Sequence, residues 1–403
     1  MPAPLHLAVA LDGAGWHPAA WREPTARPAD LFTAGYWTDL VQEAERGLLD
    51  LVTIEDSLGL QSARREGPDR RTDQVRGRLD AVLVASRVAP TTTAIGLVPT
   101  AQVTHTEPFH VSKAIATLDF VSRGRAGWRP QVSAAPADAA HFGRRTVPPV
   151  FDGSPAAAAA IDELFAEADD HVEVVRRLWD SWEDDAEIRD VATGRFVDRD
   201  KLHHIDFSGR FFSVRGPSIV PRPPQGQPVV AALAHTDRPY RFAATGADLV
   251  FVTPDDRDTA RGIVDTVQGL RATLAPGAGP LRVFADLVVL LDDDPHAARD
   301  RRERLDALDG APWTSDATIF TGTPAELADR LQHWAAAGLD GFRLRPATVP
   351  HDLQAITRGL VPLLQQRGVF RRAYETRTLR GHLGLDRPVS RYAAARTPEG
   401  VSV

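Results

Sequence analysis

The sequence contains no cysteine among its 403 residues. Disulfide scaffolds, thiolate zinc sites, iron–sulfur clusters and cysteine nucleophiles are therefore excluded. The chain also lacks an apolar run of the roughly 18–20 residues that a bilayer-spanning helix needs, and its first residues lack the basic segment that opens a secretion signal. We therefore expect a cytoplasmic protein without a membrane partner.

Charge of either sign is present without a strong excess. The chain has 47 basic and 54 acidic residues, for a formal net charge of −7. A mildly acidic chain gives no electrostatic support for a nucleic-acid or anionic-membrane partner. We therefore expect a small-molecule ligand.

Several common catalytic motifs are missing. Neither the G-x-x-x-x-G-K-[ST] phosphate loop nor the G-x-S-x-G hydrolase turn occurs, and the Gly13–Gly15 segment lacks the third glycine of a dinucleotide fingerprint. His203 and His204 lie near Asp200 and Asp206 in the sequence, but their spacing is not that of a zinc site. We predict no metal site.

What the chain does contain is an alternation of short apolar runs with segments of helical period. Eight such runs predict buried strands of a parallel sheet with crossover helices. Because about 250 residues suffice for a barrel, we predict a single TIM (β/α)8 barrel with long insertions. A doubly wound sheet with a second domain is the alternative, but no linker divides the chain. The predicted strands are Leu5–Leu11, Leu51–Ile54, Ala94–Ala101, Arg125–Ser133, Pro228–Ala234, Ala247–Thr253, Val283–Leu291 and Asp340–Arg345.

The surplus over a minimal barrel falls into three segments of one domain that spans 1–403. Residues 60–78 are polar and rich in arginine, which predicts a mobile surface loop. Residues 181–227 are rich in proline, and we expect them to cross the mouth of the barrel. Residues 371–403 form an irregular tail that we expect to wrap a neighbour or to fray.

Polar residues follow or end several of the predicted strands, and Arg129 lies within the fourth. Barrel enzymes place their chemistry at the carboxyl ends of the strands, so these residues are candidates for a site. Each has an alternative role as a turn residue or helix cap, and Asp56 in particular is suited to cap the segment after it. The candidates are His17, Glu55, Asp56, Thr100, Arg129, Ser133, His235 and Thr236.

Several segments resemble the bacterial-luciferase-like flavin-dependent monooxygenases, in particular the nitrilotriacetate, dibenzothiophene-sulfone and long-chain alkane monooxygenase subgroup. The resemblance covers nearly the whole chain. The matching segments include Gly13–Pro24 (GAGWHPAAWREP), Leu40–Ser57, Ile95–Trp128, Gly216–Val230 and Gly322–Leu344.

The resemblance implies a TIM barrel that oxygenates a small organic substrate with O2 and reduced FMN. A separate NAD(P)H:flavin reductase would supply the FMN, and the oxygenase would form a homodimer or tetramer. It places Asp56, Thr100 and Ser133 beside the flavin, and we expect His17 to face the substrate. His17 and Asp56 are thus the candidate catalytic residues.

Three departures from the family pattern bear on the cofactor. The tyrosine expected on the long helix is replaced by Leu164–Phe165, which removes a hydroxyl donor. The W-N-x-V-T-S segment reads Trp128–Ser133 (WRPQVS) here, and the A-G-x-S-x-x-G phosphate segment reads Leu233–Pro239 (LAHTDRP). Arg129, His235 and Thr236 are the candidate replacement donors to flavin or its phosphate. Two alternatives remain open. One is a non-catalytic barrel subunit that has lost flavin, and the other is an enzyme that uses deazaflavin or no flavin.

Overall fold

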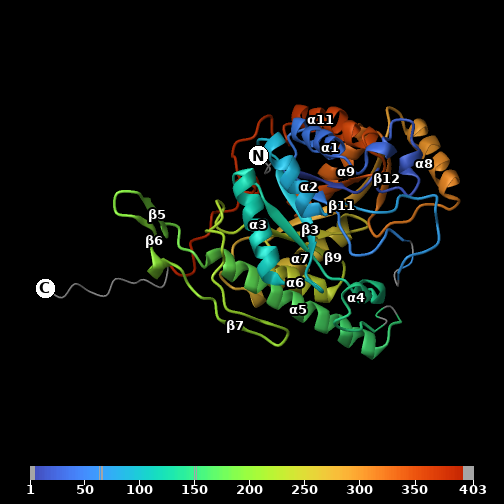
Figure 1. Cartoon of the computed structure of the whole chain (residues 1–403). Helices are drawn as coiled ribbons and strands as arrows, with labels where there is room; N and C mark the ends of the chain where they lie inside the picture. The colour runs from blue at the N-terminus through green and yellow to red at the C-terminus, as the bar shows by residue number, and fades with distance from the viewer. Residues whose placement is uncertain (1–4, 63, 65–66, 149, 151, 394–403) are drawn as a thin grey trace.

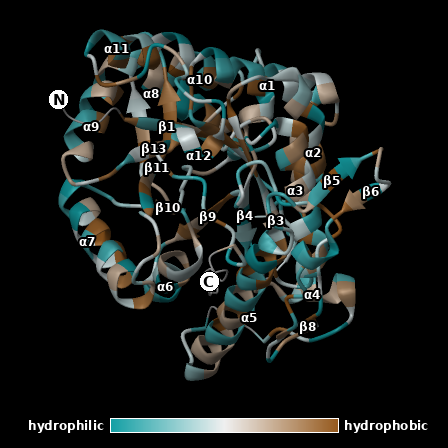
Figure 2. Ribbon diagram, turned by 90° about the vertical axis from the view of Figure 1, so that its left-hand side faces the viewer, coloured by the Kyte–Doolittle hydropathy of each residue, from teal (hydrophilic) through white to brown (hydrophobic). Residues whose placement is uncertain are grey.

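Eight parallel strands close into a barrel (Figures 1 and 2). The computed structural model describes residues 5–62, 64, 67–148, 150 and 152–393. Each strand pairs in parallel with the next, and β13 pairs with β1 to complete the ring. All eight predicted strands are present, so the predicted TIM barrel is confirmed. They are β1 (His6–Leu11), β2 (Leu51–Ile54), β3 (Gly96–Gln102), β4 (Gly127–Gln131), β9 (Val229–Ala234), β10 (Leu249–Val252), β11 (Arg282–Leu291) and β13 (Gly341–Pro346).

Helices surround the barrel (Figure 2), and polar side chains cap several of them at the start. Thr33 accepts a hydrogen bond from the Tyr36 N–H at the start of α1, and Thr323 forms a capping box with Glu326 in α9. The helices are α1 (Ala34–Arg46), α2 (Ala81–Val88), α3 (Pro108–Ser122), α4 (Pro136–Phe142), α5 (Pro155–Asp180), α6 (Asp237–Gly246), α7 (Arg257–Leu274), α8 (Pro295–Asp309), α9 (Pro324–Ala335), α10 (His351–Gln354), α11 (Val361–Gln366) and α12 (Leu379–His382). Shorter 3-10 turns lie at Ala20–Arg22, Pro28–Asp30, Ala89–Thr91 and Arg199–Lys201, and a π-helical turn lies at Ala355–Leu360.

The amino-terminal end of the barrel is closed from below by the C-terminal segment. Leu379 of α12, with Leu383 and Leu385 just after it, packs against inward-facing barrel residues that include Leu51 and Phe284. The expectation of a fraying tail is therefore wrong for residues 371–393, because their leucines fill the barrel's own core. Residues 394–403 lie outside the described residues.

The predicted course of residues 181–227 is also wrong. They form two hairpins, β5 (Glu187–Asp190) with β6 (Arg195–Val197) and β7 (Phe207–Ser208) with β8 (Ser213–Val214). Before β9, Gln225 donates to the Asp119 carboxylate at 3.0 Å and to the Ala126 carbonyl at 2.8 Å, beside the start of β4. A segment that leaves the carboxyl end of an outer helix begins at the amino-terminal end of the strands, opposite the mouth.

A ninth strand that the sequence analysis missed extends the sheet. β12 (Ile319–Gly322) pairs with the last four residues of β11, Val288–Leu291. β11 is ten residues long and so reaches beyond its barrel neighbours. Helix α8 and β12 therefore form a wall above the carboxyl end of the barrel. No helix among the described residues is long and apolar enough to cross a membrane.

Candidate functional site

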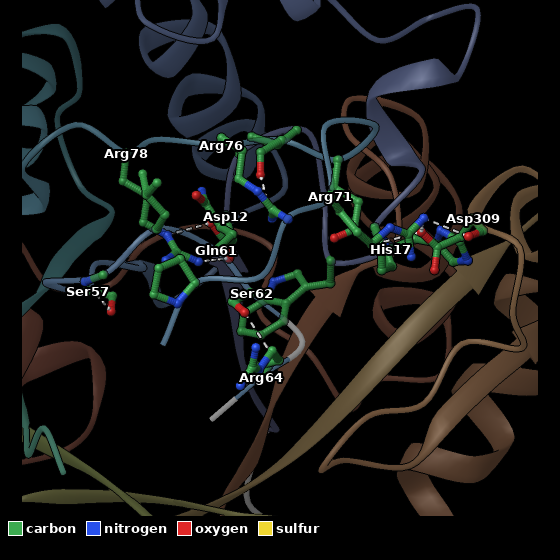
Figure 3. A pocket seen from close by; sticks show the side chains of 18 of the residues that line it. Asp12, His17, Ser57, Gln61, Ser62, Arg64, Arg71, Arg76, Arg78 and Asp309 are labelled. Carbon is green, nitrogen blue, oxygen red and sulfur yellow. Dashed lines mark hydrogen bonds and ion pairs between the residues drawn. The ribbon is translucent and has the colours of Figure 1, made fainter. Parts of the chain in front are cut away.

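A cavity of about 830 Å³ opens at the carboxyl end of the barrel (Figure 3). Its walls come from the segment after β1, the segment after β2, helix α4 after β4, and the end of α8 with the segment that follows it. Barrel enzymes bind their substrates at this end of the strands. Its lining includes residues 12–18, most of 57–78, parts of 135–141 and 309–314.

Beneath the mouth, the barrel interior holds a buried network of arginines and carboxylates. Arg343 and Arg345 on β13 lie two residues apart, so both point inward, and both bond to Asp286 on β11. Burial alone would raise the pKa of Asp286, but these two guanidinium groups hold it below its ordinary value. Arg345 also donates to Asp316 at 2.6 Å. Burial raises the pKa of the Asp316 carboxyl, but the Arg345 guanidinium lowers it further, to about 2.

The network continues to two of the predicted cofactor residues. Arg129 on β4 donates to the Thr100 hydroxyl from Nε at 3.0 Å and from Nη2 at 2.7 Å, and it forms an ion pair with Glu55. Glu55 also lies 3.3 Å from Arg343. Burial would raise the pKa of Glu55, but the neighbouring arginines lower it. Arg129 and Thr100 are therefore brought together, with Glu55 as the link to the rest of the network.

His235 joins the same network at its outer end. Its Nδ1 lies 2.8 Å from the Thr253 hydroxyl and its Nε2 lies 3.4 Å from Asp316. Burial lowers the pKa of His235, so the ring is neutral at pH 7. Thr236 is the N-cap residue of α6, but its side chain makes no capping hydrogen bond. The first turn of α6 carries Asp237, which pairs with Arg241 at 2.9 Å.

The other predicted residues lie apart from this network. Asp56 accepts hydrogen bonds from Ser57 N–H at 2.7 Å and Ala81 N–H at 3.0 Å, at the start of α2. These contacts match its alternative role as a cap, while burial raises its pKa above the ordinary value. Ser133 donates from its hydroxyl to Asp138 at 2.6 Å.

His17 lines the cavity, but both ring nitrogens have partners. The Ala19 N–H donates to Nδ1 at 3.0 Å, so Nε2 carries the proton and donates to Asp306 at 3.1 Å. The ring also meets the edge of Trp313 at 4.8 Å between centroids. Burial lowers its pKa. These contacts let His17 hold the cavity wall in place, and its two nitrogens have no free site for a proton from a substrate.

One buried polar side chain near Thr100 has no partner. Both amide atoms of Gln102, two residues along the same face of β3, lack a hydrogen bond among the described residues. Leaving such a group unpaired in the interior costs about 1–3 kcal/mol. The donor and the acceptor of this amide are therefore both unused within the described part of the chain.

The strands that carry this network were predicted from the sequence, but the ionic network formed by their charged residues was not. Asp286 sits in RVFADLVVLL, and Arg343 and Arg345 sit in GFRLRP. A charge inside an otherwise apolar strand, repeated two residues on, is the signal that would have located an inward-facing ionic cluster. Gln102 and Glu55 carry no comparable signal.

Comparisons with known proteins agree with this architecture. Residues 14–312 match the model of the luciferase-like monooxygenase family. The chain is 31% identical to N-acetyl-S-(2-succino)cysteine monooxygenase of Bacillus subtilis strain 168, over 96% of this chain and 98% of that protein. It is 30% identical to nitrilotriacetate monooxygenase component A of Aminobacter aminovorans, over 93% and 95% respectively.

A solved structure gives the same result. The crystal structure of a long-chain alkane monooxygenase superposes with a TM-score of 0.84 at 26% identity, covering 95% of this chain and 96% of that one. The family prediction is thus confirmed by sequence and by fold. The chain belongs to the luciferase-like monooxygenases, a family of oxidoreductase enzymes.

Proposed function

We propose that this chain is the oxygenase of a two-component system that uses O2 and reduced FMN to oxygenate a small organic substrate. A separate NAD(P)H:flavin reductase would deliver the reduced FMN. The proposal includes a cytoplasmic homo-oligomer built from one-domain subunits. Family membership supports the type of reaction, and the polar groups inside the barrel mouth support the cofactor.

The observation that carries the cofactor proposal is the unpaired amide of Gln102. Flavin presents alternating hydrogen-bond donors and acceptors along one ring edge, which suits an amide with both atoms free. Thr100 and Arg129 lie on the same inner surface and add a hydroxyl and a guanidinium group. Gln102, Thr100 and Arg129 would hold the ring edge, and the bound FMN would supply the electrons that activate O2.

The phosphate end fits less well than the ring. The start of α6 has no side-chain cap, so its first N–H groups are open to an anion. Asp237 places a negative charge there, and Pro239 lacks an N–H group. Arg238 is drawn away because it pairs with Asp169 at 2.7 Å. Phosphate binding would therefore rest on few donors.

Titration of the purified protein with FMN, and with photoreduced FMN under nitrogen, tests the proposal. We expect binding at about tens of micromolar, and about tenfold weaker binding for Gln102→Leu, because two hydrogen bonds are lost. Gln42→Leu is the matched control, since Gln42 on α1 donates to the Thr91 carbonyl and does not line the cavity. The proposal fails if neither form of flavin binds in that range.

A second candidate function is a barrel subunit without flavin chemistry. Arg129 favours it, because this guanidinium already bonds to Thr100 and Glu55, the groups nearest the predicted ring position. In that case neither flavin would bind, and the purified chain would oxygenate nothing with a reductase added. The same titration therefore separates the two candidates.

A further inference from the structure

In the part of the chain that the structure describes, β12 pairs with β11 along one edge and with no strand along the other. On the paired edge, the Val288 N–H donates to the Thr318 carbonyl at 3.0 Å. Further along the same edge, the Asp292 N–H donates to the Gly322 carbonyl at 3.1 Å. In a parallel pair both backbone groups of one residue point to the same side, and successive residues alternate. The even-numbered residues of β12 therefore point toward β11.

The odd-numbered residues of β12 point away from β11, so the free edge presents the N–H and C=O groups of Ile319 and Thr321. These four groups have no hydrogen-bond partner among the described residues. Both residues are half-buried, so the edge is open to solvent in part. Such a row of unpaired backbone donors and acceptors is a template for a further strand.

A groove of about 490 Å³ lies along this free edge. The side chains of Ile319 and Thr321 face α8, because Ile319 joins an apolar cluster with residues of that helix and the Thr321 hydroxyl accepts from Arg302 at 3.3 Å. Phe320 points to the opposite face, toward Arg330 of α9. Because residues of both faces line the groove, it lies at the edge itself, between α8 and α9 (Figure 1).

Two arginines that line the groove form no ion pair with any described residue. Arg299 on α8 is exposed and bonds to the ring of His296 at 3.0 Å. Arg330 on α9 lies over the ring of Phe320, with its guanidinium carbon 5.0 Å from the ring centroid. The stacking holds the Arg330 guanidinium beside the edge, and its N–H donors remain available to an anion.

The carboxylates of the groove do not neutralise these arginines. Asp306 accepts hydrogen bonds from His17 at 3.1 Å and from the Trp313 N–H at 2.9 Å, and its nearest guanidinium is Arg302 at 3.9 Å. Glu303 is exposed and forms no ion pair with a described residue. The lining has three arginines and two carboxylates, which leaves an excess of one positive charge.

We propose that this groove binds an extended acidic segment of a partner protein, which adds to β12 as a further strand. The inference is independent of the proposed oxygenase function. The four free backbone groups of the edge would bond to the backbone of the segment, which gives affinity. Acidic side chains of the segment would meet Arg299 on one side and Arg330 on the other, and such charge-assisted contacts favour an acidic sequence.

Fluorescence anisotropy on the full chain, without flavin or reductase, tests the proposal with the labelled peptide Glu-Val-Glu-Val-Glu. Successive side chains of a strand alternate, so its three glutamates share one face. We expect this peptide to bind at low salt and Lys-Val-Lys-Val-Lys not to bind. Only one alternate set of its N–H groups points to β12, so N-methylation of either the glutamates or the valines should abolish binding, and the other methylated peptide should still bind.

Thr321→Pro tests the backbone contacts. It removes one N–H group from the free edge and none from the pairing with β11, a position at which an edge strand tolerates proline. We expect it to weaken binding of the acidic peptide about tenfold. Thr321→Val is the matched control, because it loses the hydroxyl but keeps the N–H group, and it should bind as the original protein does.

Arg299→Gln and Arg330→Gln test the charges without altering the strand. Each should weaken binding of the acidic peptide about tenfold, the effect of one lost charge-assisted contact. Arg261→Gln is their control, because Arg261 is exposed on α7 and does not line the groove. It should leave binding unchanged.

Several outcomes would overturn the proposal. They are no binding of the acidic peptide, equal binding of the acidic and basic peptides, tolerance of both methylated peptides, and equal effects of Arg330→Gln and Arg261→Gln. Sedimentation velocity without peptide examines a different occupant. If the free chain self-associates and Thr321→Pro dissociates it while Thr321→Val does not, a second copy occupies the edge and the proposal is overturned. We expect the three proteins to sediment alike.

Discussion

The guanidinium group of Arg129 and the carboxylate of Glu55 form an ion pair inside the barrel, at the carboxyl ends of β4 and β2. Their pair is one end of a network in which three arginines meet three carboxylates. Arg343 and Arg345 supply the other positive charges, and Asp286 and Asp316 the other negative ones. The network therefore holds six charges without a net excess.

Asp286 is the centre of this network, so we expect Asp286→Asn to be strongly destabilising. The carboxylate is fully buried between Arg343 and Arg345, and its neutralisation leaves two positive charges facing each other. Removal of one partner from a buried pair costs about 3–5 kcal/mol. Chemical denaturation monitored by circular dichroism measures the loss.

Asp316→Asn is the control for this variant. Asp316 also pairs with Arg345, but its side chain is 47% exposed, so water can replace the lost charge. We expect a change in the free energy of unfolding of at most about 1 kcal/mol. Similar losses in the two variants would contradict the central role of Asp286.

The arrangement of the barrel was open to prediction because it depends on local patterns. Each barrel strand is a short apolar run, and the pattern alone located all eight. The course of residues 181–227 could not be predicted in the same way. Proline content shows that a segment is irregular, but not which end of the barrel it covers. Only its place after α5, which returns toward the amino-terminal end, decides that.

The candidate site was predictable in part. Thr100, which ends one predicted strand, and Arg129, which lies within the next, were candidates for one site, and the structure joins the two by a hydrogen bond. The ion pair between Glu55 and Arg129 was not predictable from local patterns, because it joins residues 74 positions apart. The paired nitrogens of His17 also depend on a distant residue, Asp306.

The negative charge of Asp237 leads to a prediction about flavin affinity. If the start of α6 receives the phosphate, Asp237→Asn removes a repulsive charge from its first turn. We expect FMN to bind about fivefold tighter, from roughly 1 kcal/mol of relieved repulsion. Fluorescence titration with FMN and with riboflavin measures the effect.

Riboflavin is the control within this experiment, since it lacks the phosphate and should bind the variant and the original protein equally. A gain for both flavins would instead point to a change at the ring. An unchanged FMN affinity would mean that the phosphate does not lie at α6.

His171 leads to a prediction about pH. It is fully buried on α5, with Trp128 at 5.8 Å and Phe212 at 6.2 Å between ring centroids, and burial lowers its pKa to about 3. Because the pKa is lowered from 6.5, the unfolded chain takes up the proton first as the pH falls. Stability is therefore full above pH 6.5 and declines below it, by about 2 kcal/mol at about pH 5.

His171→Phe removes the titrating group from this aromatic cluster. Denaturation at about pH 7 and pH 5 measures how far the free energy of unfolding falls with acid. In His171→Phe this fall should be about 2 kcal/mol smaller than in the original protein. His110→Phe, at an exposed position on α3, should keep the original decline. An unchanged acid response in His171→Phe would show that its ring is not neutral in the folded state.

The closure of the barrel base by α12 leads to the last prediction. A Cβ at Gly96 would lie 2.5 Å from Leu379 Cδ1 and 3.0 Å from the Asp50 carbonyl oxygen, so glycine makes room for the leucine. We expect Gly96→Ala to cost about 1–3 kcal/mol through overpacking. Leu379→Ala should cost about 2–5 kcal/mol through the cavity it leaves.

The double variant distinguishes a direct contact from two separate effects. The methyl group at position 96 would enter the space that the shortened side chain at 379 vacates, so the combined loss should fall short of the sum by about 1 kcal/mol or more. Gly269→Ala is the control, because nothing lies near a Cβ there and the added methyl should not destabilise the protein. Additive losses would mean that α12 does not fill the base of the barrel as the structure shows.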